Sequence, residues 1–146
     1  MEKINKSALF NQGFITVEYV AASLIDMEYH SLTEEKEIDV RKFEKEFFAK
    51  RKLIPEIAPR YRTTYFSHIN GGYSAGYYGY MWSGVLDNDG FEAFKETSLF
   101  DQETAQRFRK YVLEPNGLQD PDEMYKNFRG RAPIIEPLLR SRGLIK

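Results

Sequence analysis

The spacing of the apolar residues is the sequence feature that most restricts the fold, because it follows the helical period of three and four. A first run predicts a helix over residues 14–29: Phe14, Val17, Val20, Leu24 and Met27. A second run of Val40, Phe43 and Phe47 predicts a shorter helix, which Asp39 can cap. The members of each run lie along one side of a helix. The beginning of the chain is therefore expected to be helical.

Residues typical of helix boundaries predict further helices in the second half. Asp101 can accept hydrogen bonds from the first turn of a helix that follows it. Asp120 and Pro121 form a strong helix start, because Pro fits the first helical position. A last helix is expected to begin at Pro133 and to end before Gly143.

Prolines and glycines mark the expected connections. Pro55 and Pro59 predict an extended connection, with a short strand as one option. Residues 73–86 have helical spacing again despite three interior glycines, whose cost implies tight packing against another backbone or a ligand. A break is expected at residues 87–90. The sum is an all-α chain of about six helices with little or no sheet, forming a single unit over residues 1–146.

The charge and composition exclude few functions. The 21 Lys and Arg residues balance 22 Asp and Glu residues, so no field favours nucleic acid or an anionic membrane, and neither is expected as a partner. The absence of cysteine excludes disulfides and thiolate chemistry. No apolar run of eighteen residues and no secretory leader are present, so the chain is expected to be soluble.

Residues 68–80 carry most of the functional information, because they contain four of the ten tyrosines, four of the ten glycines and one of the two histidines. On a helix, Tyr73, Tyr77 and Tyr80 would share one face. Their hydroxyls, together with the free amides of Gly71-Gly72, could grip a peptide backbone or an oxyanion. The alternative is that the tyrosines form an amphipathic core stripe. His68 is likewise either a structural residue or a donor to a bound carbonyl.

Weaker signals are less informative. His30 and Glu34 stand four residues apart, but the residues between them are typical of a helix end, so no metal site is expected there. Two basic stretches, one around Lys50 and one near the C-terminus, could bind single-stranded nucleic acid, but solvated faces and internal salt bridges fit the balanced charge better. No serine lies in a nucleophile elbow.

The run from Tyr65 to Trp82 resembles the glycine-rich loop and following helix of the thimet oligopeptidase and peptidyl-dipeptidase family of zinc metallopeptidases. The resemblance extends over nearly the whole chain in order, through residues 11–14, 24–30, 128–133 and 138–144. It implies that Tyr80 donates a hydrogen bond to the scissile carbonyl as this becomes an oxyanion. It also implies that His68, Gly71, Gly72, Tyr73 and Tyr77 bind the substrate. Tyr78 and Trp82 are expected to pack into the domain.

The family's H-E-x-x-H helix, which supplies zinc ligands and the general base, is absent from this sequence. The resemblance therefore implies the C-terminal portion of a peptidase catalytic domain, inactive alone. Its zinc would be bound by residues absent from this chain. Short peptides would be its substrates, the missing N-terminal part its partner, and the cytoplasm its location. The alternatives are a non-catalytic helical peptide- or protein-binding module, or an interaction domain with the tyrosines in its core. Exposure of the tyrosines separates the last of these from the others.

Overall fold

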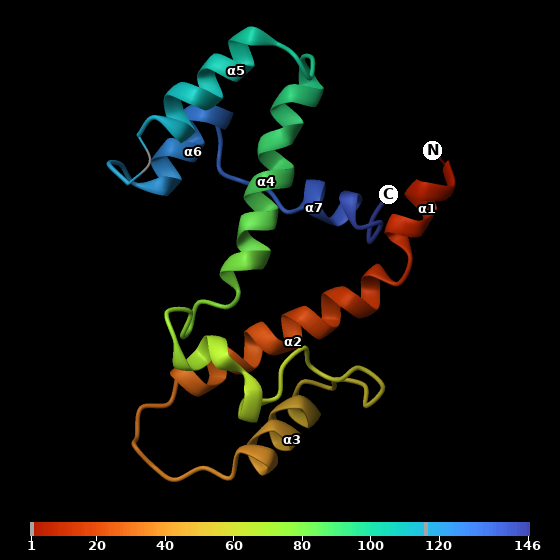
Figure 1. Ribbon diagram of the computed structural model, residues 1–146, viewed down its shortest axis with the longest axis vertical. Coiled ribbons are helices and arrows are strands. Elements are labelled where there is room, and N and C mark those ends of the chain that lie inside the picture. The colour runs from red at the N-terminus through yellow and green to blue at the C-terminus, as the bar shows by residue number, and fades with distance from the viewer. Residues whose placement is uncertain (1, 116) are drawn as a thin grey trace. The chain divides into compact units, whose positions relative to one another are not determined.

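The structure consists of helices and the turns between them. The computed structural model describes residues 2–115 and 117–146, which contain no strand, and this confirms the all-α class (Figure 1). Its α-helices are α1 (Glu2–Leu9), α2 (Gln12–His30), α3 (Val40–Lys50), α4 (Gly79–Glu96), α5 (Gln102–Phe108), α6 (Pro121–Arg129) and α7 (Glu136–Ser141). Shorter helical turns are η1 (Thr63–Tyr65), η2 (Ser67–Asn70) and η3 (Arg109–Leu113). The chain divides into two compact units, residues up to Met81 and residues from Trp82 on, and each is described by itself.

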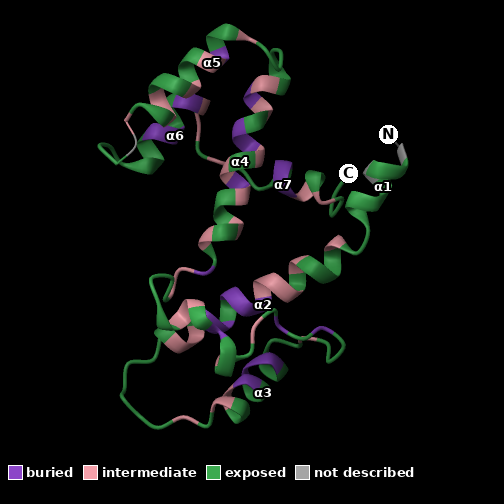
Figure 2. Ribbon diagram, viewed as in Figure 1, coloured by how far each residue is buried: buried purple, intermediate pink, exposed green. Residues whose placement is uncertain are grey.

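In the first unit, α2 confirms the predicted helix, but its large apolar residues are not its buried face. Phe14, Val17, Leu24 and Met27 are each between 37% and 39% exposed. The buried residues of α2 lie in its C-terminal half, over residues 21–26, as the purple segment in Figure 2 shows. The helix therefore packs with Ala21, Ala22 and Ile25, and it leaves the predicted apolar stripe partly open to solvent.

Helix α3 begins where the sequence predicts. The Asp39 carboxylate accepts hydrogen bonds from the amides of Arg41 and Lys42, both at 3.1 Å. The helix buries Phe47 and Phe48 against α2. The buried core of this unit consists of Ala21, Ala22, Ile25, Phe47, Phe48, Phe66 and Tyr77.

The connection after α3 contains turns, η1 and η2, and the option of a short strand was wrong. The buried Glu44 carboxylate accepts a hydrogen bond from the Thr63 amide at 2.6 Å and another from the Thr63 hydroxyl. Arg62 lies 3.5 Å from the same carboxylate. Because a side chain satisfies the Thr63 amide, this amide does not take part in a strand ladder.

Helix α4 begins later and ends later than predicted. Residues 71–78 form turns, so the helix does not start at Tyr73. It then continues to Glu96, so the break expected at residues 87–90 was wrong. Asp89 and Gly90 are buried within it. Asp89 does not turn back onto its own backbone, because its carboxylate finds partners far along the chain.

In the second unit the predicted caps of α5 and α6 are confirmed. Asp101 accepts a hydrogen bond from the Thr104 amide at 2.8 Å, and Asp120 accepts one from the Asp122 amide at 2.8 Å. Helix α6 ends at Arg129 and is followed by Gly130, which has the left-handed φ of 75°. Helix α7 begins at Glu136 rather than at the expected Pro133.

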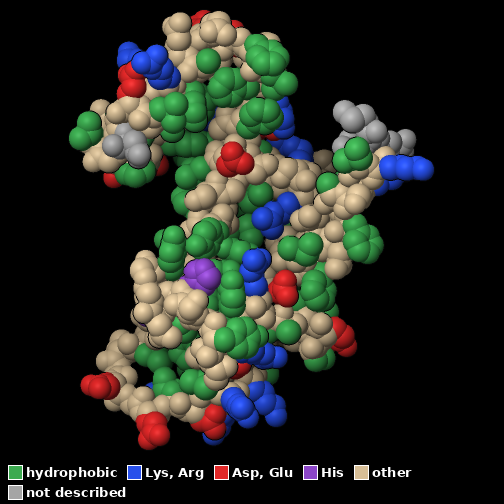
Figure 3. Space-filling view, viewed as in Figure 1, with side chains coloured by type: hydrophobic (Ala, Val, Ile, Leu, Met, Phe, Trp, Pro, Cys, Tyr) green, Lys and Arg blue, Asp and Glu red, His purple; other side chains and the backbone are tan. Residues whose placement is uncertain are grey.

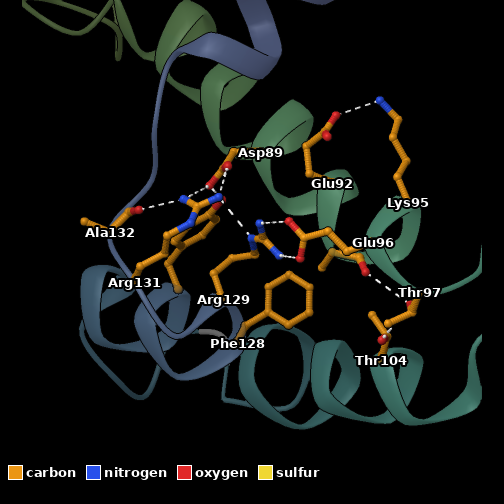
Figure 4. Close-up of polar contacts among 12 residues, drawn as sticks. Asp89, Glu92, Lys95, Glu96, Thr97, Thr104, Phe128, Arg129, Arg131 and Ala132 are labelled. Carbon is orange, nitrogen blue, oxygen red and sulfur yellow. Dashed lines mark hydrogen bonds and ion pairs between the residues drawn. The ribbon is translucent and has the colours of Figure 1, made fainter.

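A network of ion pairs around the buried Asp89 joins α4 to α6 and to the segment after it (Figure 4). The fully buried Asp89 accepts hydrogen bonds from the Tyr125 hydroxyl at 2.5 Å and from two nitrogens of Arg131 at 2.6 and 2.9 Å. Arg129 binds Glu96 through two nitrogens, at 2.9 and 3.0 Å. Burial favours a higher pKa for Asp89, but the hydrogen bonds from Arg131 and Tyr125 hold this pKa below its usual range. The two arginines thus bind the C-terminal segment to α4.

No helix in the described part of the chain combines the length and the apolar character that a membrane crossing requires.

Candidate functional site

The aromatic side chains predicted as site residues lie together in the first unit. We call His68, Tyr73, Tyr77 and Tyr80 the tyrosine cluster. The ring centre of His68 lies 5.0 Å from that of Tyr77, 5.8 Å from that of Tyr73 and 6.2 Å from that of Tyr80. The Tyr73 and Tyr80 rings are stacked at 5.5 Å, and Tyr77 and Tyr80 meet edge to face at 5.5 Å. These four rings therefore pack into one contiguous cluster.

Helical periodicity does not bring these tyrosines together, although the sequence suggested it. Tyr73 and Tyr77 precede α4 and lie in turns, and Tyr80 alone of the three lies in the helix. The Asp26 carboxylate, which is fully buried in α2, accepts hydrogen bonds from the amides of Ala75 and Tyr77, both at 3.0 Å. A charged acceptor thus satisfies two amides of the turn and fixes its path.

The sequence left two interpretations of the three tyrosines open, a binding surface or a core stripe, and their exposure supports each of them in part. Tyr77 is 2% exposed and belongs to the core, whereas Tyr73 and Tyr80 are 51% and 46% exposed. Tyr77 stacks on Tyr19 at 5.0 Å and meets Tyr61 edge to face at 5.7 Å. Its burial raises the pKa of its hydroxyl. Tyr77 is the buried centre of the cluster, and the two other tyrosines are its open edge.

Tyr80 presents a hydroxyl group that stays protonated. A hydrogen bond with Tyr73 raises the pKa of Tyr80 above its ordinary value of 10.0. A neutral phenol can donate a hydrogen bond, whereas a phenolate cannot. The half-exposed Tyr80 can therefore act as a donor to a ligand at neutral pH.

His68 is held by aromatic rings rather than by hydrogen bonds. Its ring lies 5.2 Å from Tyr61 and 5.8 Å from Phe66. Its Nδ1 atom is buried and has no hydrogen-bond partner among the described residues. A buried polar atom without a partner is uncommon and often belongs to a functional site.

The glycines of the loop are not required by close packing within the described residues. A Cβ at Gly72 or Gly79 would meet nothing within 4 Å, and one at Gly71 would lie 3.6 Å from the Ser67 carbonyl oxygen. Tight packing of Gly76, Gly79 and Gly84 against another backbone was expected, and this is wrong for the described residues. A Cβ at Gly76 or Gly84 would make ordinary contacts of 3.5 and 3.6 Å. The other option, close packing against a ligand, stays a prediction.

Two further expectations were wrong, and some cluster neighbours were missed. Tyr78 and Trp82 are 50% and 49% exposed rather than packed. Asp26, Tyr19 and Tyr61 were not singled out, although an aspartate between apolar residues of α2 was a signal that a buried partner exists.

The described residues do not provide a zinc site. They contain no group of three or more His, Asp or Glu side chains that could hold a metal ion. The Nδ1 atom of His30 lies 2.9 Å from a carboxylate oxygen of Asp26. The donor set of zinc enzymes, several nitrogen or carboxylate ligands around one point, is not formed by this part of the chain.

The chain belongs to peptidase family M3, whose sequence pattern matches residues 1–144, and this confirms the resemblance. It is 41% identical over 146 residues to dipeptidyl carboxypeptidase of Salmonella typhimurium. This match covers 98% of this chain and 22% of that protein. Identity to oligopeptidase A of Escherichia coli is 44% over 80 residues, covering 54% of this chain and 12% of that protein. Probable cytosolic oligopeptidase A of Arabidopsis thaliana is 34% identical over 150 residues, covering 99% of this chain and 21% of that protein. The chain thus spans about a fifth of the first relatives it matches.

Proposed function

We propose that this chain supplies one wall of the peptide channel in a peptidase that hydrolyses short peptides. In this proposal, residues 1–146 form the C-terminal portion of the catalytic domain. Membership of family M3 and the names of the relatives support the reaction class. The tyrosine cluster is the part of the wall that contacts the substrate.

The observation that carries the proposal is the Tyr80 hydroxyl, which is half-exposed and protonated and whose ring packs against those of Tyr73 and Tyr77. When a nucleophile attacks a peptide carbonyl, the carbonyl oxygen becomes negatively charged. A donor already in place at that oxygen stabilises the transition state more than the ground state. We assign this role to Tyr80.

The other residues of the site bind and position the peptide. Tyr73 is exposed beside Tyr80 and offers a second hydroxyl to the peptide backbone. The open space around Gly72 lets a peptide approach the loop closely. Gly71 lies beside it in the same loop, and the side chain of Ser74 holds that loop through hydrogen bonds to the carbonyl oxygens of Ile69 and Gly71.

Two members of the cluster act from its less exposed side. His68 contacts each of the three tyrosines and is proposed to bind the peptide through a ring nitrogen. Tyr77, buried as it is, contributes mainly by supporting the Tyr80 ring.

The remaining parts of the reaction lie outside the described residues in this proposal. Zinc and the general base belong to another part of the same peptidase, and no step assigned to this chain passes through them. The exposed stripe of Phe14, Val17, Leu24 and Met27 on α2 is the surface on which that part would pack. Val17 and Leu24 also line an apolar cleft of about 260 Å³ between α2 and α3. Figure 3 shows apolar side chains, in green, reaching the surface.

A chimeric enzyme tests the proposal. The matching segment of Salmonella typhimurium dipeptidyl carboxypeptidase is replaced by this chain, and cleavage of a short quenched peptide is measured. Tyr80→Phe removes only the hydroxyl and should lower kcat by about 100- to 1,000-fold. Tyr78→Phe is the matched control, because it makes the same change at a tyrosine of similar exposure and should leave kcat unchanged.

Two results would overturn the proposal. If Tyr80→Phe cleaves as fast as the chimera with tyrosine, the hydroxyl has no role in the reaction. If the 146-residue chain cleaves the peptide by itself, its chemistry is not the one proposed. A chain that binds peptides but gives an inactive chimera with native-like circular dichroism would instead support a binding module.

A further inference from the structure

A pair of polar side chains on α2, Asp26 and His30, binds the turn that leads to Tyr80. The Asp26 carboxylate is fully buried, and its two oxygens each accept a backbone amide of the turn at 3.0 Å, one from Ala75 and one from Tyr77. The Nδ1 atom of His30 lies 2.9 Å from the same carboxylate and 2.8 Å from the Asp26 carbonyl oxygen. Because both neighbours of this nitrogen are acceptors, it carries the hydrogen and donates it to Asp26. Three donors thus converge on one buried carboxylate.

The turn contains a residue that needs such a contact. Ala75 has a φ of 55°, in the left-handed region that residues other than glycine rarely adopt. A residue in this region persists only when the surrounding structure holds it there. The amide of Ala75 is one of the two that Asp26 binds. Asp26 therefore stabilises the least favourable residue of the turn.

The same turn continues directly into the part of α4 that carries Tyr80. Helix α4 begins at Gly79, whose amide donates to the Gly76 carbonyl oxygen at 2.9 Å. Tyr77 precedes Tyr80 by three residues, and its buried ring meets the Tyr80 ring edge to face at 5.5 Å. A displacement of Tyr77 would therefore move both the backbone before Tyr80 and the ring that supports it.

We propose that Asp26, held by His30, is a positioning residue for the Tyr80 hydroxyl. Asp26 contacts no substrate in this proposal and acts only through the turn. A donor to an oxyanion must lie within hydrogen-bond distance of it, and a displacement of about 1 Å can slow a reaction by about 100-fold. This proposal rests on the proposed function, because it takes the Tyr80 hydroxyl as the donor in the transition state.

The first test is Asp26→Asn in the chimeric enzyme. The carboxamide keeps the size of the side chain, but its NH2 group faces one of the donors that the carboxylate accepted. The change should lower kcat by about 10- to 100-fold and change KM by less, since it displaces a group that acts in the transition state. Asp39→Asn is the matched control, because the Asp39 carboxylate also accepts two backbone amides but caps α3, and kcat should stay unchanged.

A double-mutant cycle with Tyr80→Phe separates positioning from a general loss of structure. If Asp26 acts through the Tyr80 hydroxyl, Asp26→Asn should lower kcat by less than about 3-fold once that hydroxyl is absent. An equal loss of kcat with and without the hydroxyl overturns the proposal, as does a folded Asp26→Asn variant with the kcat of the wild type.

His30→Ala decides the question if Asp26→Asn does not fold. His30 is partly exposed, and its removal leaves both amide contacts of Asp26 in place. The variant should lower kcat by about 2- to 10-fold, the effect of one hydrogen bond. This loss should also disappear in the Tyr80→Phe background, and its persistence there overturns the proposal.

A readout without cleavage distinguishes failure of this proposal from failure of the proposed function. A fluorine atom on the Tyr80 ring gives a 19F NMR signal that reports the surroundings of this ring in the chimera. Asp26→Asn or His30→Ala should shift or broaden the signal, whereas Asp39→Asn should not. Such a change supports the positioning of Tyr80 by Asp26 even if Tyr80→Phe leaves kcat unchanged, a result that would overturn the proposed function alone. A signal equal to that of the wild type in both variants overturns the positioning role.

Discussion

Removal of the Asp89 carboxylate should destabilise the second unit strongly. Asp89 is fully buried in α4 and accepts three hydrogen bonds, one from Tyr125 and two from Arg131. Asp89→Ala leaves the Arg131 charge and the Tyr125 hydroxyl without this acceptor. A buried ion pair that loses one partner costs about 3 to 5 kcal/mol. Because the Arg131 side chain is 37% exposed and can regain some water, we expect the lower end, about 3 kcal/mol.

Urea unfolding measures this loss. The fluorescence of Trp82, the chain's single tryptophan, reports on the second unit. A loss of about 3 kcal/mol should lower the urea midpoint by about 1 to 3 M. Asp87→Ala is the matched control, because Asp87 lies two residues away on the exposed side of α4 and should shift the midpoint little.

A double-mutant cycle with Arg131 decides whether the ion pair is the cause. If Asp89 acts through Arg131, the variant with both residues changed to alanine should lose less stability than the two single variants added together. Strict additivity, or a midpoint for Asp89→Ala equal to that of Asp87→Ala, would refute the reasoning.

Two further predictions concern acid stability and the loop. Hydrogen bonds from Arg131 and Tyr125 hold the pKa of Asp89 in the folded chain below its usual range, against the effect of burial. As the pH falls below about 4, Asp89 is therefore protonated in the unfolded chain before it is protonated in the folded one. The melting temperature should therefore drop through that range, and Asp89→Asn should flatten the drop; an unchanged pH profile would contradict this. Asp26→Ala removes the acceptor of two amides at a cost of about 1 to 3 kcal/mol each, and hydrogen exchange at Ala75 and Tyr77 should accelerate. Protection equal to that of the wild type would show that the turn holds without Asp26.

The helix caps could be predicted from the sequence because they depend on neighbouring residues. Asp39, Asp101 and Asp120 accept hydrogen bonds from amides two or three residues ahead. The same side chain at Asp26 and Asp89 has partners more than thirty residues away. These distant partners explain both errors around α4, its late start and its unbroken course through residues 87–90. Local propensity carries no information about contacts at that separation.

The sequence predicted which residues form the candidate site, but not the contacts that hold them in place. His68, Tyr73, Tyr77 and Tyr80 are close in sequence, and the structure brings them together. The neighbours on which the arrangement depends come from elsewhere: Tyr19 lies in α2, 58 residues before the Tyr77 it contacts. The division of the tyrosines into one buried and two exposed residues follows from that packing and from no local pattern.

The mutual packing of the rings has a consequence for the entropy of binding. A side chain that becomes ordered on binding a ligand costs about 0.5 to 1.5 kcal/mol. Tyr73 and Tyr80 already restrict one another by stacking at 5.5 Å, and Tyr77 beneath Tyr80 is held by the core. The rings have lost much of this freedom during folding, before a ligand arrives. The cluster is preorganised in this sense, so under the proposed function a peptide would use its contacts for affinity rather than for ordering the side chains that bind it.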